Sequence, residues 1–301
     1  MTDSAWIITG PTSGIGHRTA LELAKHGTVV LVGRNPDKLG EVLQQIESDG
    51  GRAVSVVCDM SDVASVRRAA ADIIALDLPV AGLLNNAGIM ATKPFQTAQG
   101  WDGTFATDHL GRSPSPRHSP PPCWTARTSC SSSPPLRTPS AGPPSSPASG
   151  ARYISAEASA RGEWLPGGSK LPGGDAYATS KQGNLATVFA LARENPRLRF
   201  NAVEPGFSPG SNLGRDANMA LRLLSRYVLP PVAPIIKYWS TPKRAARVIS
   251  AVLTDPAVVT GEYYDEKGRP MHGSTQVSDL GFQDRVVAET RALLATVPTP
   301  G

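Results

Sequence analysis

The fold is decided by residues 5–27, which read AWIITGPTSGIGHRTALELAKHG. Residues 6–9 form a short apolar run, which predicts a buried strand, and residues 14–26 carry apolar side chains at helical spacing. Gly10 stands between the two patterns and Gly14 and Gly16 lie at the start of the second, and glycine has no Cβ to prevent a tight turn. The stretch therefore predicts a strand, a glycine-rich turn and a helix.

The turn after this first strand is a candidate phosphate-binding site. A helix that begins at such a turn presents free backbone N–H groups, and its dipole favours a negative charge at that end. Glycine in the turn also lets a pyrophosphate approach the backbone closely. The alternative is a glycine-rich turn that binds no ligand. The candidate residues are Gly10, Thr12, Ser13, Gly14, Ile15 and Gly16.

Strand and helix patterns continue to alternate along the chain. Three more apolar runs predict further strands before about residue 85, with helices between them that are capped by Asn35 and by Ser61. Helical and strand patterns resume after residue 176. This order predicts a single α/β domain over residues 1–301, built on a doubly wound, Rossmann-like parallel sheet.

The predicted second strand ends at Gly33-Arg34. In sheets of this kind an acidic residue at that point bonds the ribose hydroxyls of NAD, whereas an arginine accommodates the 2′-phosphate of NADP. Arg34 has no acid beside it, so the sequence favours NADP(H) over NAD. The alternative is a solvated surface arginine, which is the more common setting for this residue type.

A second candidate group is Tyr177-Ala178-Thr179-Ser180-Lys181. The phenol and the ammonium are four residues apart, which places them on one face of a helix. A nearby positive charge stabilises a phenolate, so Lys181 is expected to lower the pKa of Tyr177 and prepare it for proton transfer. The alternative is a buried tyrosine beside a lysine whose charged end reaches solvent.

Five motifs follow one another along the chain: TGxxxGxG at 9–16, Cys58-Asp59, NNAG at 85–88, YxxxK at 177–181 and Pro205-Gly206. These motifs, in this order, resemble those of the short-chain dehydrogenase/reductase family, and within it the longer retinol-dehydrogenase-like members of bacteria. The resemblance covers residues 5–111 and about 150–290.

The resemblance implies an oxidoreductase that moves a hydride between a nicotinamide and a carbonyl or carbinol carbon, while Tyr177 exchanges a proton with the oxygen. It further implies that Asp59 contacts the adenine and that Lys181 binds the nicotinamide ribose as well as tuning Tyr177. Pro205 and Gly206 would border the nicotinamide. The residues implied to support the adenine-ribose side are Asn85, Asn86, Ala87 and Gly88.

Two positions depart from the family pattern. Asp108 stands where the resemblance implies an asparagine that helps a water-linked proton relay, although an aspartate still accepts hydrogen bonds. The serine that would bond the substrate oxygen is not identified. Ser131, Ser132 and Ser133 lie near the right interval, but the sequence around them does not predict the strand that would orient them.

Residues 112–149 are the largest departure. Eleven prolines and eleven serines fill 22 of these 38 positions, a composition that favours an irregular or disordered segment. The family has a long helix and its central fifth strand here, so we expect the sheet of this chain to have a gap. We hypothesise a displaced reading frame, because GC-rich codons read two nucleotides on would give the apolar residues of the missing helix and strand. Resequencing the gene tests this.

Composition excludes several other classes of protein. The net charge is +5, but four arginines in residues 112–149 leave +1 for the rest, which argues against a nucleic-acid-binding face. Three cysteines without a CxxC pair support neither a disulfide framework nor a metal site. No export signal and no apolar stretch of membrane-spanning length is found, so we expect a cytoplasmic protein without a membrane span.

The leading hypothesis is an NADP(H)-dependent enzyme that interconverts an alcohol and a ketone or aldehyde. Residues 207–240 are rich in apolar side chains and are expected to form a lid over an apolar small-molecule substrate, or else simply to pack the core. Two alternatives are a dinucleotide-binding protein without catalysis and an impaired product of a frameshifted gene. A homodimer is a further expectation, because family members commonly pair through a helix in this region.

Overall fold

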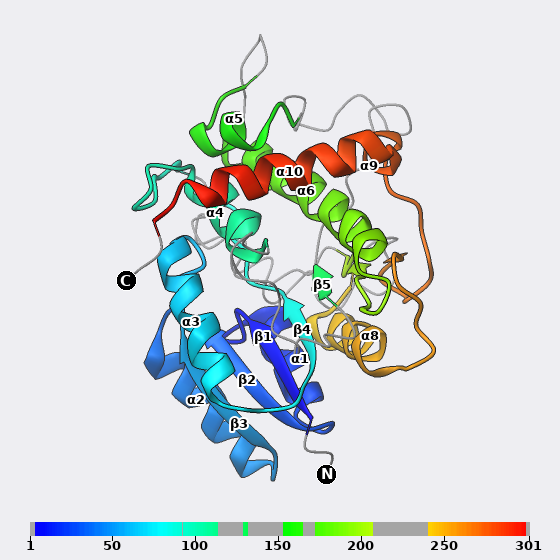
Figure 1. Ribbon diagram of the computed structural model, residues 1–301. Helices are drawn as coiled ribbons and strands as arrows, with labels where there is room; N and C mark the ends of the chain where they lie inside the picture. Colours follow the sequence, from blue (N-terminus) through cyan, green and yellow to red (C-terminus); the bar gives the residue numbers. More distant parts are fainter. Residues whose placement is uncertain are drawn as a thin grey trace, which may run out of the picture.

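The computed structural model describes residues 4–91, 93–113, 129–131, 153–164, 172–206 and 240–298. Its central strands are β1 (Ala5–Thr9), β2 (Thr28–Gly33), β3 (Arg52–Val57), β4 (Val80–Asn85) and β5 (Ser129–Ser131). They form one parallel sheet in the order β3-β2-β1-β4-β5 (Figure 1). The chain moves outward from β1 to β3 and then crosses back to β4. This order confirms the predicted doubly wound α/β fold.

Side chains of the central strands alternate between two buried faces. Ile7 packs with Val30 and the side chains of α3 (Val63–Ala75), whereas Ile8 packs with Leu31 on the opposite face. Because both faces are covered by helices, β1 and β2 at the centre of the sheet are almost wholly apolar and read as continuous runs. The helices over the second face are α1 (Gly14–Leu23), α2 (Pro36–Ser48) and α8 (Pro242–Thr254).

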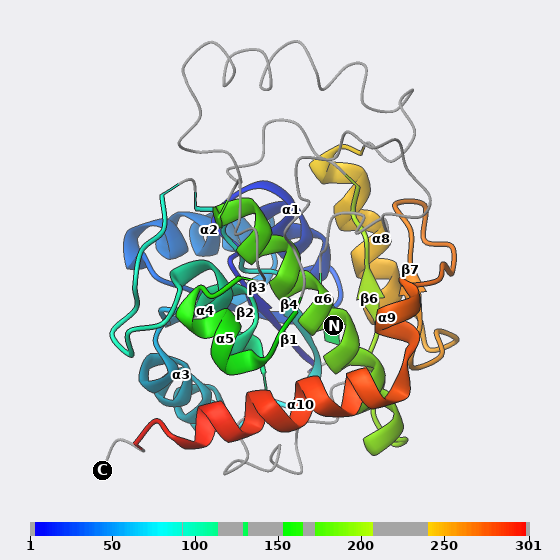
Figure 2. The same cartoon turned by 90° about the horizontal axis from the view of Figure 1, so that it is seen from above.

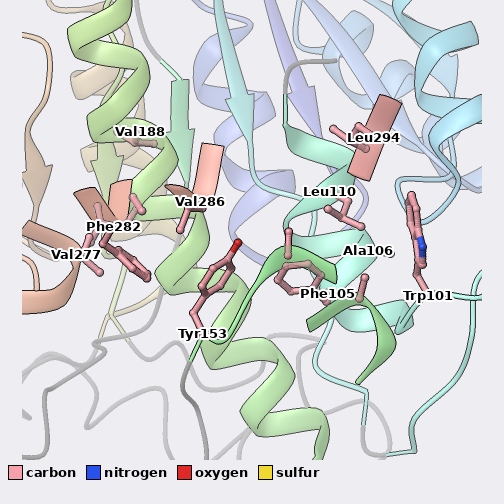
Figure 3. Close-up of a cluster of buried hydrophobic side chains, with 14 of the residues drawn as sticks. Trp101, Phe105, Ala106, Leu110, Tyr153, Val188, Val277, Phe282, Val286 and Leu294 are labelled. Carbon is pink, nitrogen blue, oxygen red and sulfur yellow. The ribbon is translucent and has the colours of Figure 1, made fainter. Parts of the chain in front are cut away.

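A third cluster of buried side chains lies beside the sheet (Figure 3). Phe105 and Leu110 contribute to it from the chain after β4, and Phe282 and Val286 from α10 (Leu280–Ala295). This long helix packs across α6 (Pro172–Glu194) and α5 (Ala156–Arg161), as Figure 2 shows. The remaining short elements are α4 (Gly103–Asp108), η1 (Leu110–Arg112) and α9 (Thr275–Ser278).

The expected gap in the sheet occurs at a different place. Ser129–Ser131 forms a three-residue strand, β5, that pairs in parallel with β4. The next two strands, β6 (Ala202–Val203) and β7 (Tyr263–Tyr264), pair with each other in a separate ladder, although β6 lies beside β5. The five-stranded ladder therefore stops after β5, whereas the sequence predicted that this strand itself was missing.

Of the two predicted helix caps, one is found in the structure and the other is replaced by the neighbouring residue. Asn35 caps α2 as predicted, accepting a hydrogen bond from Lys38 N at 2.9 Å. The cap of α3 is Asp62, which accepts from Ala64 N at 3.0 Å. The prediction of Ser61 was wrong, because its hydroxyl instead donates to Asp59 Oδ1 at 2.7 Å. A carboxylate at a helix N-terminus is also favoured by the helix dipole.

Several predicted segments lie partly or wholly outside the described residues. Of residues 112–149, the structure describes Arg112, Ser113 and β5, and of the predicted lid at 207–240 it describes Ser240. In the described part of the chain, no helix combines the length and hydropathy needed to cross a membrane.

One buried cation ties the end of α10 to α3. The side chain of Arg67 is 8% exposed and donates to Leu294 O at 2.9 Å, Val297 O at 2.9 Å and Pro298 O at 2.8 Å. These carbonyls follow the last turn of α10, where helical backbone acceptors have no partner within the helix. Arg67 therefore satisfies acceptors that would otherwise be buried without a donor.

Replacing Arg67 tests this link. We expect Arg67→Met to lower the free energy of unfolding by about 2–4 kcal/mol, because charge-assisted hydrogen bonds are lost and the carbonyls are left unsatisfied. Urea unfolding measures the change. The matched control is Arg68→Met, since Arg68 is 59% exposed and has only a 3.8 Å contact with Asp62. Equal losses in the two variants would contradict the assignment.

Candidate active site

The glycine turn after β1 has a backbone that only glycine adopts readily. Gly10 and Gly14 have positive φ values of 67° and 58°. A Cβ on Gly10 would lie 2.8 Å from Ala87 Cα, and one on Gly16 would lie 2.2 Å from Gly10 O. These contacts are too short for any other residue, so the turn packs directly against the chain that follows β4.

The NNAG segment braces this turn. The Asn86 side chain donates from Nδ2 to Thr9 O and to Gly10 O, both at 3.1 Å. The backbone N–H groups of Asn86 and Ala87 both donate to Thr9 Oγ1, at 3.0 Å. The sequence pointed to a cofactor-binding role for this segment, and the structure adds that it holds the turn in shape.

The start of α1 suits a phosphate group. Ser13 is the N-cap of α1, yet its side chain makes no capping hydrogen bond, so its hydroxyl is not used to cap the helix. Thr12, Ser13, Gly14 and Ile15 are all partly exposed, and the first amides of a helix have no partner within it. The chemistry of this end therefore fits the pyrophosphate expected there.

The two residues predicted to contact the adenosine half of the cofactor lie after β2 and β3. Arg34 follows β2 directly and its side chain is exposed, so its charge is accessible. Asp59 follows β3, and its Oδ1 accepts from Ser61 N at 2.9 Å and from Ser61 Oγ at 2.7 Å. Both lie after the carboxyl ends of their strands, the edge at which ligands bind to such sheets.

Tyr177 and Lys181 come together on α6, as the spacing predicted. Both side chains are buried, at 8% and 2% exposure, and Lys181 Nζ lies 4.7 Å from the centre of the Tyr177 ring. Lys181 Nζ also lies 3.3 Å from Asp108 Oδ2, and Asp108 is fully buried. The other oxygen, Asp108 Oδ1, accepts from Ile89 N at 2.8 Å. Asp108 thus joins α6 to the segment after β4 through a direct ion pair.

Arg112 is a site residue that the sequence reasoning missed. Its Nη2 donates to Asn86 O at 3.4 Å and would lie 2.9 Å from a Cβ on Gly88. The same Cβ position is 3.3 Å from each carboxylate oxygen of Asp108. In the sequence, Arg112 is the first residue of the proline- and serine-rich stretch 112–149. Arg112 is four residues from Asp108 in the sequence, and side chains four residues apart are neighbours on a helix. This spacing could have identified Arg112 as a neighbour of Asp108.

His109 anchors the Asp108 backbone. Its Nδ1 is 2.9 Å from Asn184 Oδ1, its Nε2 is 2.9 Å from Thr290 Oγ1, and Asn184 Nδ2 donates to Asp108 O at 2.7 Å. Burial lowers the pKa of His109 to about 4, so the ring is neutral at physiological pH. This network connects α6 and α10 to the end of α4.

Glu204 is a second site residue that the sequence reasoning missed. It is 1% exposed, precedes Pro205 and Gly206, and accepts from the Tyr263 hydroxyl at 3.1 Å. Burial raises the pKa of Glu204 well above its usual range. Pro205 and Gly206 are also buried, and Gly206 has a φ of 74°. The position of this acid immediately before the Pro-Gly pair could have identified Glu204 as a site residue from the sequence.

The electrostatics of the Tyr177 site differ from the expectation. The pKa of Tyr177 is raised well above its usual value, first by burial and then by the negative charges of Asp108 and Glu204, whereas Arg112 lowers it. The pKa of Lys181 is lowered to about 8, first by burial and then by the positive charge of Arg112, while Asp108 opposes both. The pKa of Tyr177 is thus raised overall, and Arg112 is a cation that opposes this rise. That Lys181 also lowers the pKa of Tyr177 stays a prediction.

Two further expectations concern side chains that are only partly described. Of the candidate serines, Ser131 is the last residue of β5, and Ser132 and Ser133 lie outside the described residues. Among the residues whose side chains are described, no three His, Cys, Asp or Glu gather as a metal site would require.

Several known proteins are similar to this chain in sequence. Residues 4–111 match the family described as short chain dehydrogenase. A short-chain dehydrogenase/reductase of Armillaria gallica is 27% identical over 290 residues, covering 91% of this chain and 87% of its own length. Polyprenol dehydrogenase of Mus musculus is 40% identical over 108 residues, 35% of this chain and 32% of that protein. Human retinol dehydrogenase 13 is 34% identical over 108 residues, covering 35% and 33%.

Solved structures share the fold. A short chain dehydrogenase from Burkholderia cenocepacia in complex with NADP has a TM-score of 0.59 at 21% identity, covering 89% of this chain and 97% of that one. An alcohol dehydrogenase from the archaeon Thermococcus sibiricus, complexed with 5-hydroxy-NADP, has a TM-score of 0.58 at 19% identity, covering 89% and 99%. Residues 4–111 of this chain therefore match the short chain dehydrogenase family, and the fold is similar to that of these solved structures.

Proposed function

We propose that this chain is an NADP(H)-dependent oxidoreductase that interconverts an alcohol and a ketone or aldehyde on an apolar small molecule. The proposal rests on a chain of contacts that links the Tyr177–Lys181 pair on α6 to the glycine turn after β1. Lys181 lies beside the Tyr177 ring and pairs with Asp108, Asp108 accepts from Ile89 N just after the NNAG segment, and that segment braces the glycine turn. These contacts support a site in which the proposed proton-transfer pair and the proposed phosphate-binding turn act on one cofactor.

The proposed proton donor in the reducing direction is the Tyr177 phenol. A bound dihydronicotinamide would supply the hydride, with its two electrons, to the carbonyl carbon. The Tyr177 phenol gives its proton to the carbonyl oxygen, so that an alcohol forms and a phenolate remains. In the oxidising direction the phenolate takes that proton back. Lys181 lies beside the Tyr177 ring, which supports the proposal that it would bind both the phenol and a ribose hydroxyl.

NADP(H) is the proposed cofactor because of the charge at the end of β2. Arg34 is exposed there without an adjacent acid, which favours a 2′-phosphate over free ribose hydroxyls. Similar solved structures from Burkholderia cenocepacia and Thermococcus sibiricus hold NADP or a derivative of it. An apolar substrate is proposed from the composition of residues 207–240 and from the names of two relatives, since polyprenol and retinol are both apolar alcohols.

A second candidate function is dinucleotide binding without catalysis. The raised pKa of Tyr177 and the ion pair that engages Lys181 favour it, because a phenol that resists ionisation is a poor general base. An impaired product of a frameshifted gene is the third reading. A cytoplasmic location and a homodimer remain predictions from the sequence.

Tyr177→Phe separates the first two functions. We expect turnover of NADPH with apolar aldehydes and ketones to fall by at least about 100-fold, because the proton donor is lost, while NADPH binding stays within a few-fold. Steady-state assays and a fluorescence titration with NADPH measure the two. The control is Tyr153→Phe, which removes a hydroxyl that is bonded to Glu289 and is expected to keep turnover. Undiminished turnover in Tyr177→Phe would exclude the proposed proton donor.

Arg34→Asp tests the cofactor. We expect the Kd for NADPH to rise by roughly 10- to 100-fold, because a charge-assisted contact is replaced by repulsion, while the Kd for NADH changes little. Arg34→Lys keeps the charge and is the matched control, expected to retain most of the preference. If the ratio of the two dissociation constants is the same in Arg34→Asp and the wild-type chain, Arg34 does not select NADP(H).

NADPH binding also tests whether the chain is an impaired product of a frameshifted gene. A folded site must be stabilised by its ligand, so the Tm of the full chain is expected to rise with NADPH concentration. The same scan with Arg34→Asp is expected to need correspondingly more NADPH for the same rise. A wild-type Tm that does not respond to NADPH at any concentration would support the impaired product.

A further inference from the structure

The charges around Tyr177 come from four separate parts of the chain. Asp108 faces it from the end of α4, Arg112 from η1, Lys181 from α6 and Glu204 from the segment after β6. His109 is close by but neutral at physiological pH, because burial lowers its pKa to about 4. The ionisation of Tyr177 therefore depends on how these charges balance.

Asp108 engages Lys181. The two charged groups are 3.3 Å apart and almost fully buried, at 0% and 2% exposure. Because opposite charges at this distance form a neutral pair, Lys181 with Asp108 stabilises a phenolate less than an isolated ammonium would. An asparagine at position 108 would leave the charge of Lys181 uncompensated. The aspartate in this chain therefore creates a need for another cation.

Arg112 stands at the place where that cation is required. The Arg112 Nη2 and both Asp108 carboxylate oxygens lie close to the position that a Cβ on Gly88 would take. That position is 2.9 Å from Arg112 Nη2 and 3.3 Å from each Asp108 oxygen. Arg112 is also held by Asn86 O, at 3.4 Å, in the segment that braces the glycine turn. We propose that Arg112 is a positioning residue of the proposed reaction, which offsets Asp108 and supplies the positive charge that stabilises the Tyr177 phenolate.

The charge balance supports this role. With Tyr177 as a phenolate, the cluster of Tyr177, Asp108, Lys181 and Arg112 contains two negative and two positive charges. Glu204 adds a further negative charge that opposes the ionisation of Tyr177, which increases the need for a second cation. Arg112 also lowers the pKa of Tyr177, whereas Asp108 raises it. The proposal rests on the proposed function for its chemistry, but the charge cluster itself is measurable without a substrate.

The test follows the Tyr177 phenolate by its ultraviolet absorbance. Spectra of the full chain are recorded against pH, and those of the same variant carrying Tyr177→Phe are subtracted, which leaves the titration of Tyr177 alone. The decisive comparison is made with Asp108→Asn present, because removing that negative charge lowers the midpoint into an accessible range of pH. Adding Arg112→Met to Asp108→Asn is expected to raise the midpoint by at least about one pH unit.

Two matched variants distinguish charge from structural damage. With Asp108→Asn present, Arg112→Lys keeps a cation and is expected to hold the midpoint near that of Asp108→Asn alone. Arg197→Met removes an exposed arginine from the turn after α6 and is expected to leave the midpoint unchanged. Circular dichroism establishes that each variant is folded before it is titrated.

The outcomes separate this proposal from the proposed function. The same midpoint in Asp108→Asn with and without Arg112→Met overturns the role of Arg112, whatever the activity. A midpoint that rises with Arg112→Met, in a chain that does not turn over NADPH with any carbonyl compound, supports the charge cluster and contradicts the proposed enzyme. If the chain is active, the pH profile of alcohol oxidation is expected to shift to higher pH in Arg112→Met and to lower pH in Asp108→Asn.

Discussion

The site depends on the close contact between the chain after β1 and the chain after β4. Gly10 lies against Ala87, and Asn86 donates to the carbonyls of Thr9 and Gly10. Neighbouring parallel strands end at the same edge of a sheet, but their loops need not touch. Here they do, because glycine leaves room for the approach and the Asn86 amide satisfies two backbone acceptors. The groups proposed to bind phosphate and to move a proton are both placed relative to this contact.

The buried ion pair between Asp108 and Lys181 has a cost as well as a use. Removing two charges from water is unfavourable unless their geometry and their other hydrogen bonds compensate. Asp108 is supported by Ile89 N and its backbone by Asn184, and Arg112 lies next to it. The result is a polar network inside a domain whose other clusters are apolar. Such a network favours one arrangement of α4, η1 and α6 over others that would leave a charge without a partner.

The parts of this structure that depend on local sequence could be predicted, and those that depend on distant contacts could not. The strand, turn and helix at the N-terminus follow from glycine positions and from apolar spacing within 27 residues. Tyr177 and Lys181 follow from helical periodicity alone. The choice of Asp62 over Ser61 as a cap depends on where the helix backbone begins, which two adjacent capping residues do not determine. Arg112 and Glu204 acquire their roles only when separate segments meet around Tyr177.

The separation of β6 and β7 from the five-stranded ladder divides the site between two frameworks of unequal strength. The glycine turn belongs to the long ladder, whereas Glu204, Pro205 and Gly206 follow a strand of two residues held by β7. Few backbone hydrogen bonds hold that pair, among them Ala202 N to Glu262 O at 2.9 Å and Glu204 N to Tyr264 O at 2.7 Å. Local opening is easiest where few such bonds must break. We therefore expect the wall proposed to border the nicotinamide to open more readily than the glycine turn, so that cofactor exchange and substrate entry need not disturb the same part of the domain.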